Sequence, residues 1–215
     1  MSLTALVARV VGRGRRTREV TRITLAARRS NATVDLHVAP TARLGDIDVR
    51  FAPGTHNVLT VGEHSVLDDG VEIRLSGGEL RIGEWVEVRG GVRLMVSGCF
   101  VAEGENVLSW GTVIHCAEMV TFERQATCAE YATVVDSVHE HVEGEWHADH
   151  VRTAPVRVGV ETWVGAKATI TPGVTIGAHC SVAGSAVVTH DVPDGHLAIG
   201  IPAACRPLPP PRKPR

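Results

Sequence analysis

The sequence predicts an all-β chain wound as a parallel β-helix, in which short strands follow one another around a three-sided coil. Two observations predict this fold. An aliphatic residue recurs at every sixth position from Val158 to Val188, and a small or β-branched residue follows most of them four positions later. A period of six matches neither an α-helix nor a simple alternating strand, but it fits a chain that turns a corner every six residues.

Three sides of this kind close a coil of about 18 residues, and parallel pairing stacks successive coils about 4.8 Å apart. The aliphatic positions should point inward and the small positions should lie near the corners. Two shorter blocks upstream repeat in another phase, so insertions of a few residues separate them. The predicted inward positions are Val61, Leu67, Ile82, Val88, Leu94, Trp110, Cys116, Phe122, Cys128, Val134, Val158, Val164, Ile170, Ile176, Val182 and Val188.

Three segments lie outside the repeat. Residues 2–29 mix Leu and Val with many Arg and predict a helix, so 1–30 is taken as a basic N-terminal segment. The β-helix domain is expected over 31–205. Within it, the polar stretch 139–155 interrupts the hexads without changing their register and predicts a loop extruded from the coil. Residues 206–215 form a basic, proline-rich tail.

Charge is distributed unevenly along the chain. Residues 1–30 hold eight Arg and one acid, Glu19, whereas residues 31–205 hold 10 basic and 23 acidic residues. A basic N-terminus is compatible with peripheral contact with an anionic membrane, or simply with a solvated helix. Both alternatives stay open, and we expect no nucleic-acid partner.

Cysteine usage and hydropathy indicate the cellular compartment in which the protein is expected. The five Cys form no C-x-x-C pair, and several fall on inward positions, so they are expected to be small core residues. An odd count without a signal peptide predicts a cytoplasmic protein. No apolar run approaches the roughly 18–20 residues that span a membrane.

The segment PVRVGVETWVGAKATITPGVTIGAHCSVAGSAVVTHDVPDGHLAIGIPA carries three runs in order: W-V-G-A, P-G-V-T-I-G and V-V-T-x-D-V-P. It resembles the signature of the hexapeptide-repeat acyltransferases, which include maltose, galactoside, nodulation and capsule-type O-acetyltransferases. The resemblance implies a left-handed β-helix, acetyl-CoA as acyl donor, a homotrimer, and an active site between adjacent subunits.

The same resemblance assigns a catalytic residue. The family places its histidine where the last regular hexad gives way to the extruded loop, and His139 occupies that position in VVDSVHEH. An imidazole, with an ordinary pKa of about 6.5, can take the proton of an acceptor hydroxyl at neutral pH. The backbone amide of Ala166 would stabilise the thioester oxyanion. Glu145, or Glu143 as the alternative, would orient the imidazole.

Further residues are assigned to the two substrates. For coenzyme A, the resemblance implies contacts by Ala166, Gly184, Thr189, His190 and Arg206. For the acceptor, we expect contacts by Trp146 and Asp136; Trp110 and Tyr131 are alternative stacking residues, although Trp110 falls on an inward position.

The sequence therefore favours an acetyl-CoA-dependent O-acetyltransferase acting on a sugar, a glycan or a glycosylated metabolite. One alternative is an N- or O-acyltransferase for an amino sugar or an antibiotic-like acceptor. Another is a non-catalytic or metal-binding β-helix. The cluster His139, His141, His147 and His150 has a spacing that matches no common zinc site, so no metal is expected.

Overall fold

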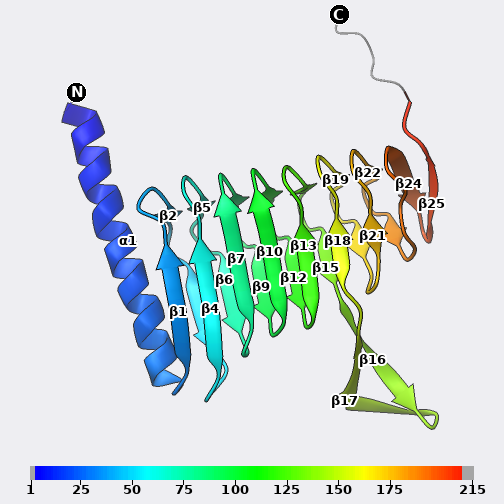
Figure 1. Cartoon of the computed structure of the whole chain (residues 1–215), viewed down its shortest axis with the longest axis horizontal. Helices are drawn as coiled ribbons and strands as arrows, with labels where there is room; N and C mark the ends of the chain where they lie inside the picture. The colour runs from blue at the N-terminus through cyan, green and yellow to red at the C-terminus, as the bar shows by residue number, and fades with distance from the viewer. Residues whose placement is uncertain (1–2, 210–215) are drawn as a thin grey trace, which may run out of the picture.

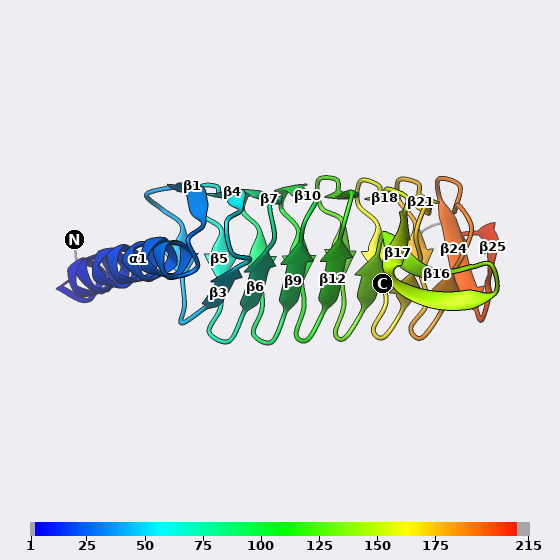
Figure 2. The ribbon, with the colours of Figure 1, turned by 90° about the horizontal axis from the view of Figure 1, so that it is seen from below.

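The computed structural model describes residues 3–209, without the side chains of residues 3–15, 142 and 146–149. It is a parallel β-solenoid preceded by one helix, which confirms the predicted fold class (Figure 1). The chain passes through three sheets in turn, so each coil has three sides and three corners. Figure 2 shows the coils following one another along the axis, with the helix at one end.

Three parallel sheets form the sides. Sheet A contains β1 (Thr33–Val38), β4 (His56–Val61), β7 (Glu79–Glu84), β10 (Cys99–Gly104), β13 (Met119–Phe122), β18 (Val156–Val158) and β21 (Thr175–Ile176). Sheet B contains β2 (Arg43–Leu44), β5 (Val66–Leu67), β8 (Glu87–Val88), β11 (Val107–Leu108), β14 (Thr127–Cys128), β19 (Trp163–Val164), β22 (Ser181–Val182), β24 (His196–Gly200) and the antiparallel β25 (Ala203–Pro207). Sheet C contains β3 (Asp48–Phe51), β6 (Glu72–Leu75), β9 (Arg93–Val96), β12 (Val113–Cys116), β15 (Thr133–Val135), β20 (Thr169–Ile170) and β23 (Val187–Val188).

Coil length changes along the solenoid. In the middle of sheet A, Glu79 pairs with Cys99, so one full coil advances the chain by 99 − 79 = 20 positions. Near the C-terminus Arg157 pairs with Thr175, so one full coil advances it by 175 − 157 = 18 positions. The coil length predicted from three hexads therefore holds only for the C-terminal coils, and the earlier coils have longer strands in sheets A and C.

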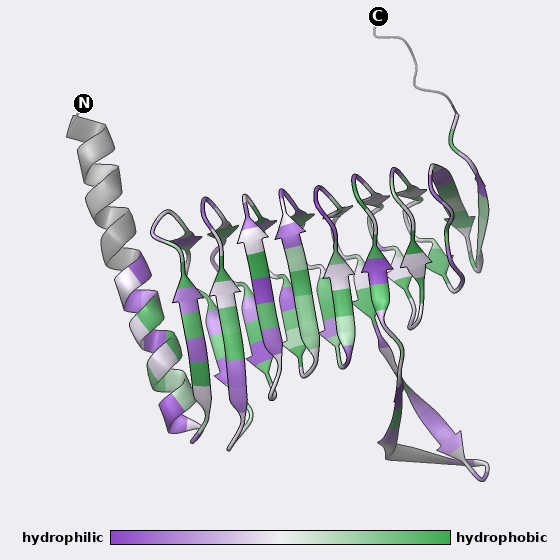
Figure 3. Ribbon diagram, in the orientation of Figure 1, coloured by the Kyte–Doolittle hydropathy of each residue, from purple (hydrophilic) through white to green (hydrophobic). Residues whose placement is uncertain are grey.

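The core is a continuous column of aliphatic side chains, and Figure 3 shows apolar residues along the strands of every coil. Leu67, Ile82, Leu94 and Ile170 are at most 1% exposed, as the hexad pattern predicted. Phe100 and Phe122 stack on neighbouring strands of sheet A with their ring centroids 5.9 Å apart. Such pairs favour tilted or offset geometry, and these rings are tilted by 49°.

One predicted inward position is wrong. The side chain of Trp110 is 50% exposed, and Leu108 occupies the inward position of this side instead. Leu108 keeps the six-residue spacing to Ile114, and the two additional residues of this coil lie between Ile114 and Phe122, so a phase extended back from Phe122 falls on Trp110. Val138, predicted at a small corner position, is also exposed, because it belongs to the extruded segment.

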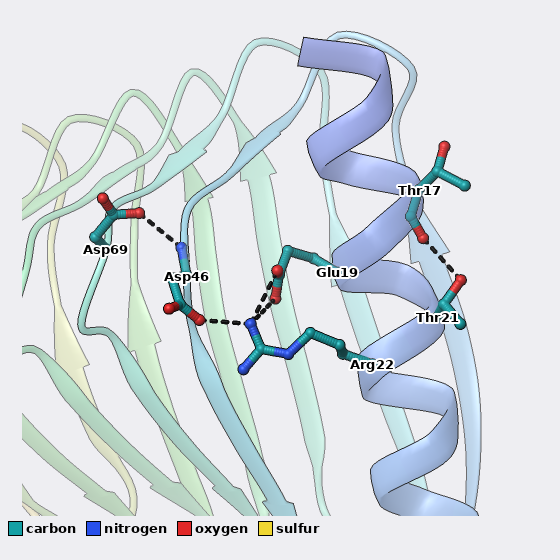
Figure 4. A network of polar contacts seen from close by, with 6 residues as sticks. All are labelled: Thr17, Glu19, Thr21, Arg22, Asp46 and Asp69. Atoms are coloured by element: carbon teal, nitrogen blue, oxygen red, sulfur yellow. Dashed lines mark hydrogen bonds and ion pairs between the residues drawn. The ribbon is translucent and has the colours of Figure 1, made fainter. Parts of the chain in front are cut away.

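The helix α1 (Leu3–Arg29) seals the first coil. Ile23 and Ala27 are 2% exposed and belong to the same apolar cluster as the solenoid core. Arg22 bonds both to Glu19 on the helix and to Asp46 of the first coil, whose backbone N–H donates to Asp69 of the second coil (Figure 4). Without this helix the open end of the core would face water. Among the described residues, no helix combines the length and apolar character that a membrane crossing requires.

The interruption of the repeat is a β-hairpin that projects from the solenoid (Figure 1). Its strands are β16 (Ser137–Val142) and β17 (Glu145–Thr153), so the extruded segment begins two residues before the predicted boundary. Glu143 and Gly144 both have positive φ, which is typical of the tight two-residue turn that joins such strands. The hexads resume after the hairpin, since Val120 of β13 pairs with Val156 of β18.

Candidate active site

His139 lies on β16, two residues beyond the point where the chain leaves the coil. The corner from which it departs joins sheet C to the following strand of sheet A and is called the CA corner below. The imidazole is exposed, and the backbone of His139 pairs with Val151 on the other hairpin strand. The side chain thus stands at the base of the hairpin, as the sequence predicted.

A cleft of about 300 Å³ opens beside His139 along the CA corner. It is walled by the hairpin base on one side and by the outer surface of sheet C on the other. Its lining residues are Arg74, Ser76, Met95, Val96, Ser97, His115, Cys116, Ala117, Ser137, His139 and Val151.

A second histidine, His115 on β12, lines the same cleft. Partial burial lowers the pKa of His115, and the nearby Asp136 carboxylate opposes this shift without cancelling it. A lowered pKa keeps the imidazole neutral at neutral pH, so it can accept a hydrogen bond or a proton from a bound hydroxyl.

Asp136 was predicted to contact the acceptor, and the structure instead gives it a role inside the corner. The residue is 0% exposed, and its carboxylate accepts hydrogen bonds from the backbone N–H groups of Ala117, Glu118 and Met119 at 2.7, 2.8 and 2.9 Å. A carboxylate enclosed in this way has no surface left for a substrate. The assignment to the acceptor is therefore wrong, and Asp136 holds the CA corner of the preceding coil.

Glu145, predicted to orient His139, lies elsewhere on the hairpin. It pairs with Val142 directly beside the turn, whereas His139 pairs with Val151 at the base. Extended strands advance about 3.3 Å per residue, so three residues separate the two groups by roughly 10 Å. The assignment of Glu145 or Glu143 to the imidazole stays a prediction. The acid nearest to His139 in sequence, Glu140, is engaged by Arg152 at 2.6 Å.

Ala166 lies at a different corner, where the chain passes from sheet B to sheet C. This BC corner is a β-turn in which Lys167 has φ 61° and the N–H of Ala168 donates to the carbonyl of Gly165 at 3.2 Å. A positive φ at the third residue identifies a type II turn. Among the described residues, none accepts a hydrogen bond from the Ala166 N–H, so this amide is available to a ligand.

The residues predicted to contact coenzyme A divide between these two corners. Gly184 stacks directly on Ala166, since the N–H of Ser185 donates to the Ala166 carbonyl at 2.8 Å. Thr189 and His190 follow β23 at the CA corner, where the Thr189 hydroxyl lies 2.9 Å from Nδ1 of His190. Arg206 lies on β25 opposite Leu197, at the end of sheet B.

Two sets of groups therefore stand at opposite edges of sheet C. His139, Thr189 and His190 mark the CA edge, while Ala166 and Gly184 mark the BC edge. The two corners lie at the two ends of the strands of sheet C, so the length of a strand separates them. A single chain therefore does not bring the imidazole and the Ala166 amide together.

The aromatic candidates are placed as follows. The side chain of Trp146 lies outside the described part of the structure, so its assignment stays a prediction. Trp110 and Tyr131 are exposed on neighbouring coils at the BC corner, below Ala166. Arg89 lies over the Trp110 ring at 4.4 Å.

Sequence reasoning missed most of the cleft. Successive strands of sheet C bring outer residues into register, namely Arg74, Met95, His115 and Val135. These residues are spaced by 21, 20 and 20 positions in the sequence, but they share no side-chain property that would mark this spacing. The six-residue period marks inward positions and carries no information about outer neighbours.

Comparisons with known proteins agree with this architecture. A probable acetyltransferase of Mycobacterium tuberculosis is 28% identical over 160 residues, which is 72% of this chain and 53% of that protein. The galactoside O-acetyltransferase of Escherichia coli is 38% identical over 52 residues, 24% of this chain and 25% of that enzyme. The chain fits the hexapeptide-repeat acetyltransferase family. It matches about half the length, or less, of these curated relatives, and no family model matches it.

Solved structures extend the likeness of the fold. The polysialic acid O-acetyltransferase OatWY aligns with a TM-score of 0.64 and 18% identity over 85% of this chain and 89% of that one. A variant of the N-acyltransferase AntD from Bacillus cereus, in complex with dTDP and coenzyme A, aligns with a TM-score of 0.59 and 18% identity over 69% of this chain and 83% of that one. At this level of identity the likeness concerns the fold.

Proposed function

We propose that the chain is an acetyl-CoA-dependent O-acetyltransferase that acts on a saccharide or a glycosylated acceptor. The observation that carries the proposal is the position of His139 on the wall of a cleft, where the coil gives way to the hairpin. The named activities of the relatives, and the coenzyme A bound by AntD, support the choice of donor.

In the proposed reaction, His139 takes the proton of an acceptor hydroxyl as the oxygen attacks the thioester carbon. The carbonyl oxygen becomes an oxyanion, and the free N–H of Ala166 donates a hydrogen bond to it. Collapse of the intermediate breaks the carbon–sulfur bond, and the imidazolium returns its proton to the departing thiolate. The products are the acetyl ester and free coenzyme A.

The two groups that act on the thioester come from different subunits in this proposal. His139 and Ala166 lie at opposite edges of sheet C, so a second copy of the chain must supply one of them. A homotrimer satisfies this requirement, because each CA edge can then face the BC edge of a neighbour. Val138 and Val151, exposed at the base of the hairpin, would be covered by that contact.

The first experiment measures acetyl transfer from acetyl-CoA to a panel of mono- and oligosaccharides. We expect His139→Ala to reduce kcat by about 10²–10⁴-fold, the usual contribution of general-base catalysis. His179→Ala is the matched control, because that histidine is exposed at another corner beside Glu161. Unchanged turnover in His139→Ala would contradict the proposed mechanism.

The second experiment removes the Ala166 N–H by the substitution Ala166→Pro. The second position of a type II turn accepts proline, so the turn should persist while its donor is lost. We expect kcat to fall by roughly 10²–10³-fold, as for the loss of other oxyanion donors. Glu130→Pro makes the same change one coil below and should leave kcat close to wild type.

The alternative acceptor class is an amino sugar. AntD, an N-acyltransferase, shares the fold, which keeps this alternative open. The same panel discriminates between the two classes, because transfer to nitrogen gives an amide that resists mild alkaline hydrolysis whereas an ester does not.

A further inference from the structure

The cleft beside His139 continues well past the position of a single acceptor ring. Along sheet C, Val135 pairs with His115, His115 with Met95, and Met95 with Arg74. Each step between neighbouring strands is about 4.8 Å, so the Arg74 backbone lies roughly 14 Å from that of Val135. One pyranose ring is too short to cover this length.

The floor of the cleft carries a row of hydroxyl groups. Ser76, Ser97 and Ser137 occupy equivalent places at the CA corner of different coils, with Ala117 between the last two. None of the three hydroxyls bonds to another residue in the described part of the chain, so each can bind the hydroxyls of a ligand. Repetition at the coil spacing suits an elongated polar ligand that follows the solenoid axis.

The charge of the cleft is positive or neutral. Its described lining residues include Arg74, His115 and His139 but no Asp or Glu. Glu72 lies 4.0 Å from Arg74 outside this lining, and the Asp136 carboxylate is enclosed by backbone N–H groups. A carboxylate on the ligand would therefore meet a cation without facing a lining acid.

Arg74 differs from three arginines in the same local setting. An acid stands two residues before Arg50, Arg81 and Arg89, and in each case the acid holds the guanidinium at 2.7, 2.6 and 3.0 Å respectively. The corresponding separation between Arg74 and Glu72 is 4.0 Å, the limit of an ion pair. Of these four arginines, the one that lines the cleft is the one whose guanidinium is not engaged at hydrogen-bonding distance.

We propose that Arg74 binds a carboxylate of the acceptor and that the acceptor is an acidic oligosaccharide lying along the CA corner. The hydroxyl to be acetylated would lie at His139, and the carboxylate would belong to a sugar further along the chain. This inference rests on the proposed acyltransferase function and adds a substrate class to it.

The test uses pairs of oligosaccharides that differ only in charge. A hyaluronan hexasaccharide and a sialic acid trimer are each compared with the carboxyl-reduced form of the same compound, and kcat and KM are measured with acetyl-CoA. The uronic acid pair and the sialic acid pair distinguish two sources of the carboxylate. We expect wild type to acetylate at least one acidic member with the lower KM.

The substitution Arg74→Ala should raise the KM for that acidic acceptor roughly 10- to 100-fold, the usual cost of losing a charged hydrogen bond. We expect kcat, and turnover of the reduced acceptor, to stay close to wild type. The KM of Arg74→Lys for the acidic acceptor should fall between those of wild type and Arg74→Ala, since lysine keeps the charge but cannot make a bidentate contact. Arg81→Ala is the matched control, because Arg81 lies on sheet A and is held by Glu79, and it should change neither constant.

Two results would overturn the role of Arg74. One is equal KM for both members of each pair in wild type, and the other is an unchanged KM for the acidic acceptor in Arg74→Ala. If no acidic acceptor is acetylated while neutral sugars are, the substrate class is wrong and the acyltransferase function stands. If none of the reactions that consume acetyl-CoA depends on His139, the proposed function itself is wrong.

Discussion

At the scale of single residues, side chains at the corners help to hold the solenoid together, as do those in the core. Asp136 is fully buried and its carboxylate accepts three backbone N–H groups of the coil below. Buried donors that lose their acceptor cost about 1–3 kcal/mol each. The corner that carries the hairpin, and hence His139, is thus held by one acid.

Asp136→Asn should lower the free energy of unfolding by about 3 kcal/mol. The substitution keeps one oxygen but turns an amide NH₂ toward N–H groups that need an acceptor. Urea unfolding followed by circular dichroism measures the change. Asp194→Asn is the control, since that exposed acid accepts a single N–H from Ala178 at 2.8 Å and should cost less than about 1 kcal/mol. Equal losses in both variants would contradict this account.

The cysteines give a prediction about pH. Burial raises the pKa of Cys116 to about 12 and raises the pKa of Cys128 further, whereas Cys205 is exposed. Because the thiolate is the reactive form, iodoacetamide at about pH 8 should label Cys205 in the native protein and spare Cys116 and Cys128. In urea all five should react, as peptide mass mapping would show.

The same shifts fix the direction of the pH effect on stability. Above the ordinary thiol pKa of 9.0, the unfolded chain releases protons that the folded chain still holds at Cys116 and Cys128. Unfolding is therefore favoured as the pH rises from about 9 toward 12. Labelling of Cys116 in the native state at a rate equal to that of Cys205 would show that the thiol is not enclosed.

At the scale of elements, close stacking of the coils depends on glycines that face backbone. A Cβ on Gly165 would lie 2.6 Å from the Val182 carbonyl oxygen and 2.7 Å from the Gly184 nitrogen. A Cβ on Gly184 would lie 3.2 Å from the Ala166 oxygen and 4.0 Å from the Ala166 nitrogen. The two glycines stand at the BC corners of successive coils, and a methyl group meets closer backbone contacts at the first than at the second.

Gly165→Ala should therefore lower the free energy of unfolding by roughly 2–4 kcal/mol, because two backbones must separate. Gly184→Ala should cost less than about 1 kcal/mol but raise the KM for acetyl-CoA, since its methyl group covers the surface beside the Ala166 amide. Thermal unfolding and initial-rate kinetics on both variants measure these effects. The reverse pattern would remove Gly184 from the proposed donor site.

At the scale of the whole molecule, the solenoid separates groups that must meet in the proposed reaction. His139 and Ala166 lie at opposite edges of sheet C, and the rigid three-sided core prevents these edges from approaching within one chain. Assembly of several copies is therefore part of the proposed chemistry.

Mixed oligomers test this requirement. We expect His139→Ala and Ala166→Pro to be almost inactive alone and to recover partial activity when the two are co-expressed. A site formed by an intact BC edge of one subunit and an intact CA edge of the next exists only in the mixture. Absence of recovery, with co-assembly verified by differential affinity tags, would place both groups on the same subunit.

The sequence by itself determined the solenoid, most of its inward positions, the helix before it and the place of the hairpin. It could do so because the core column holds apolar side chains, so the six-residue period of Val164, Ile170 and Ile176 is visible in the sequence itself. The place of His139 at the base of the hairpin was predicted in the same way, since an interruption of a regular repeat is visible without coordinates.

Only the tertiary structure decided which outer residues are neighbours. Coils longer than three hexads place Arg74 and His115 in the cleft of His139, turn Trp110 outward and bury Asp136. Outward residues face solvent and carry no periodic constraint, so their sequence does not report coil length. That length depends on how many residues each side of the coil holds when the backbones stack, which is a property of the packed solenoid.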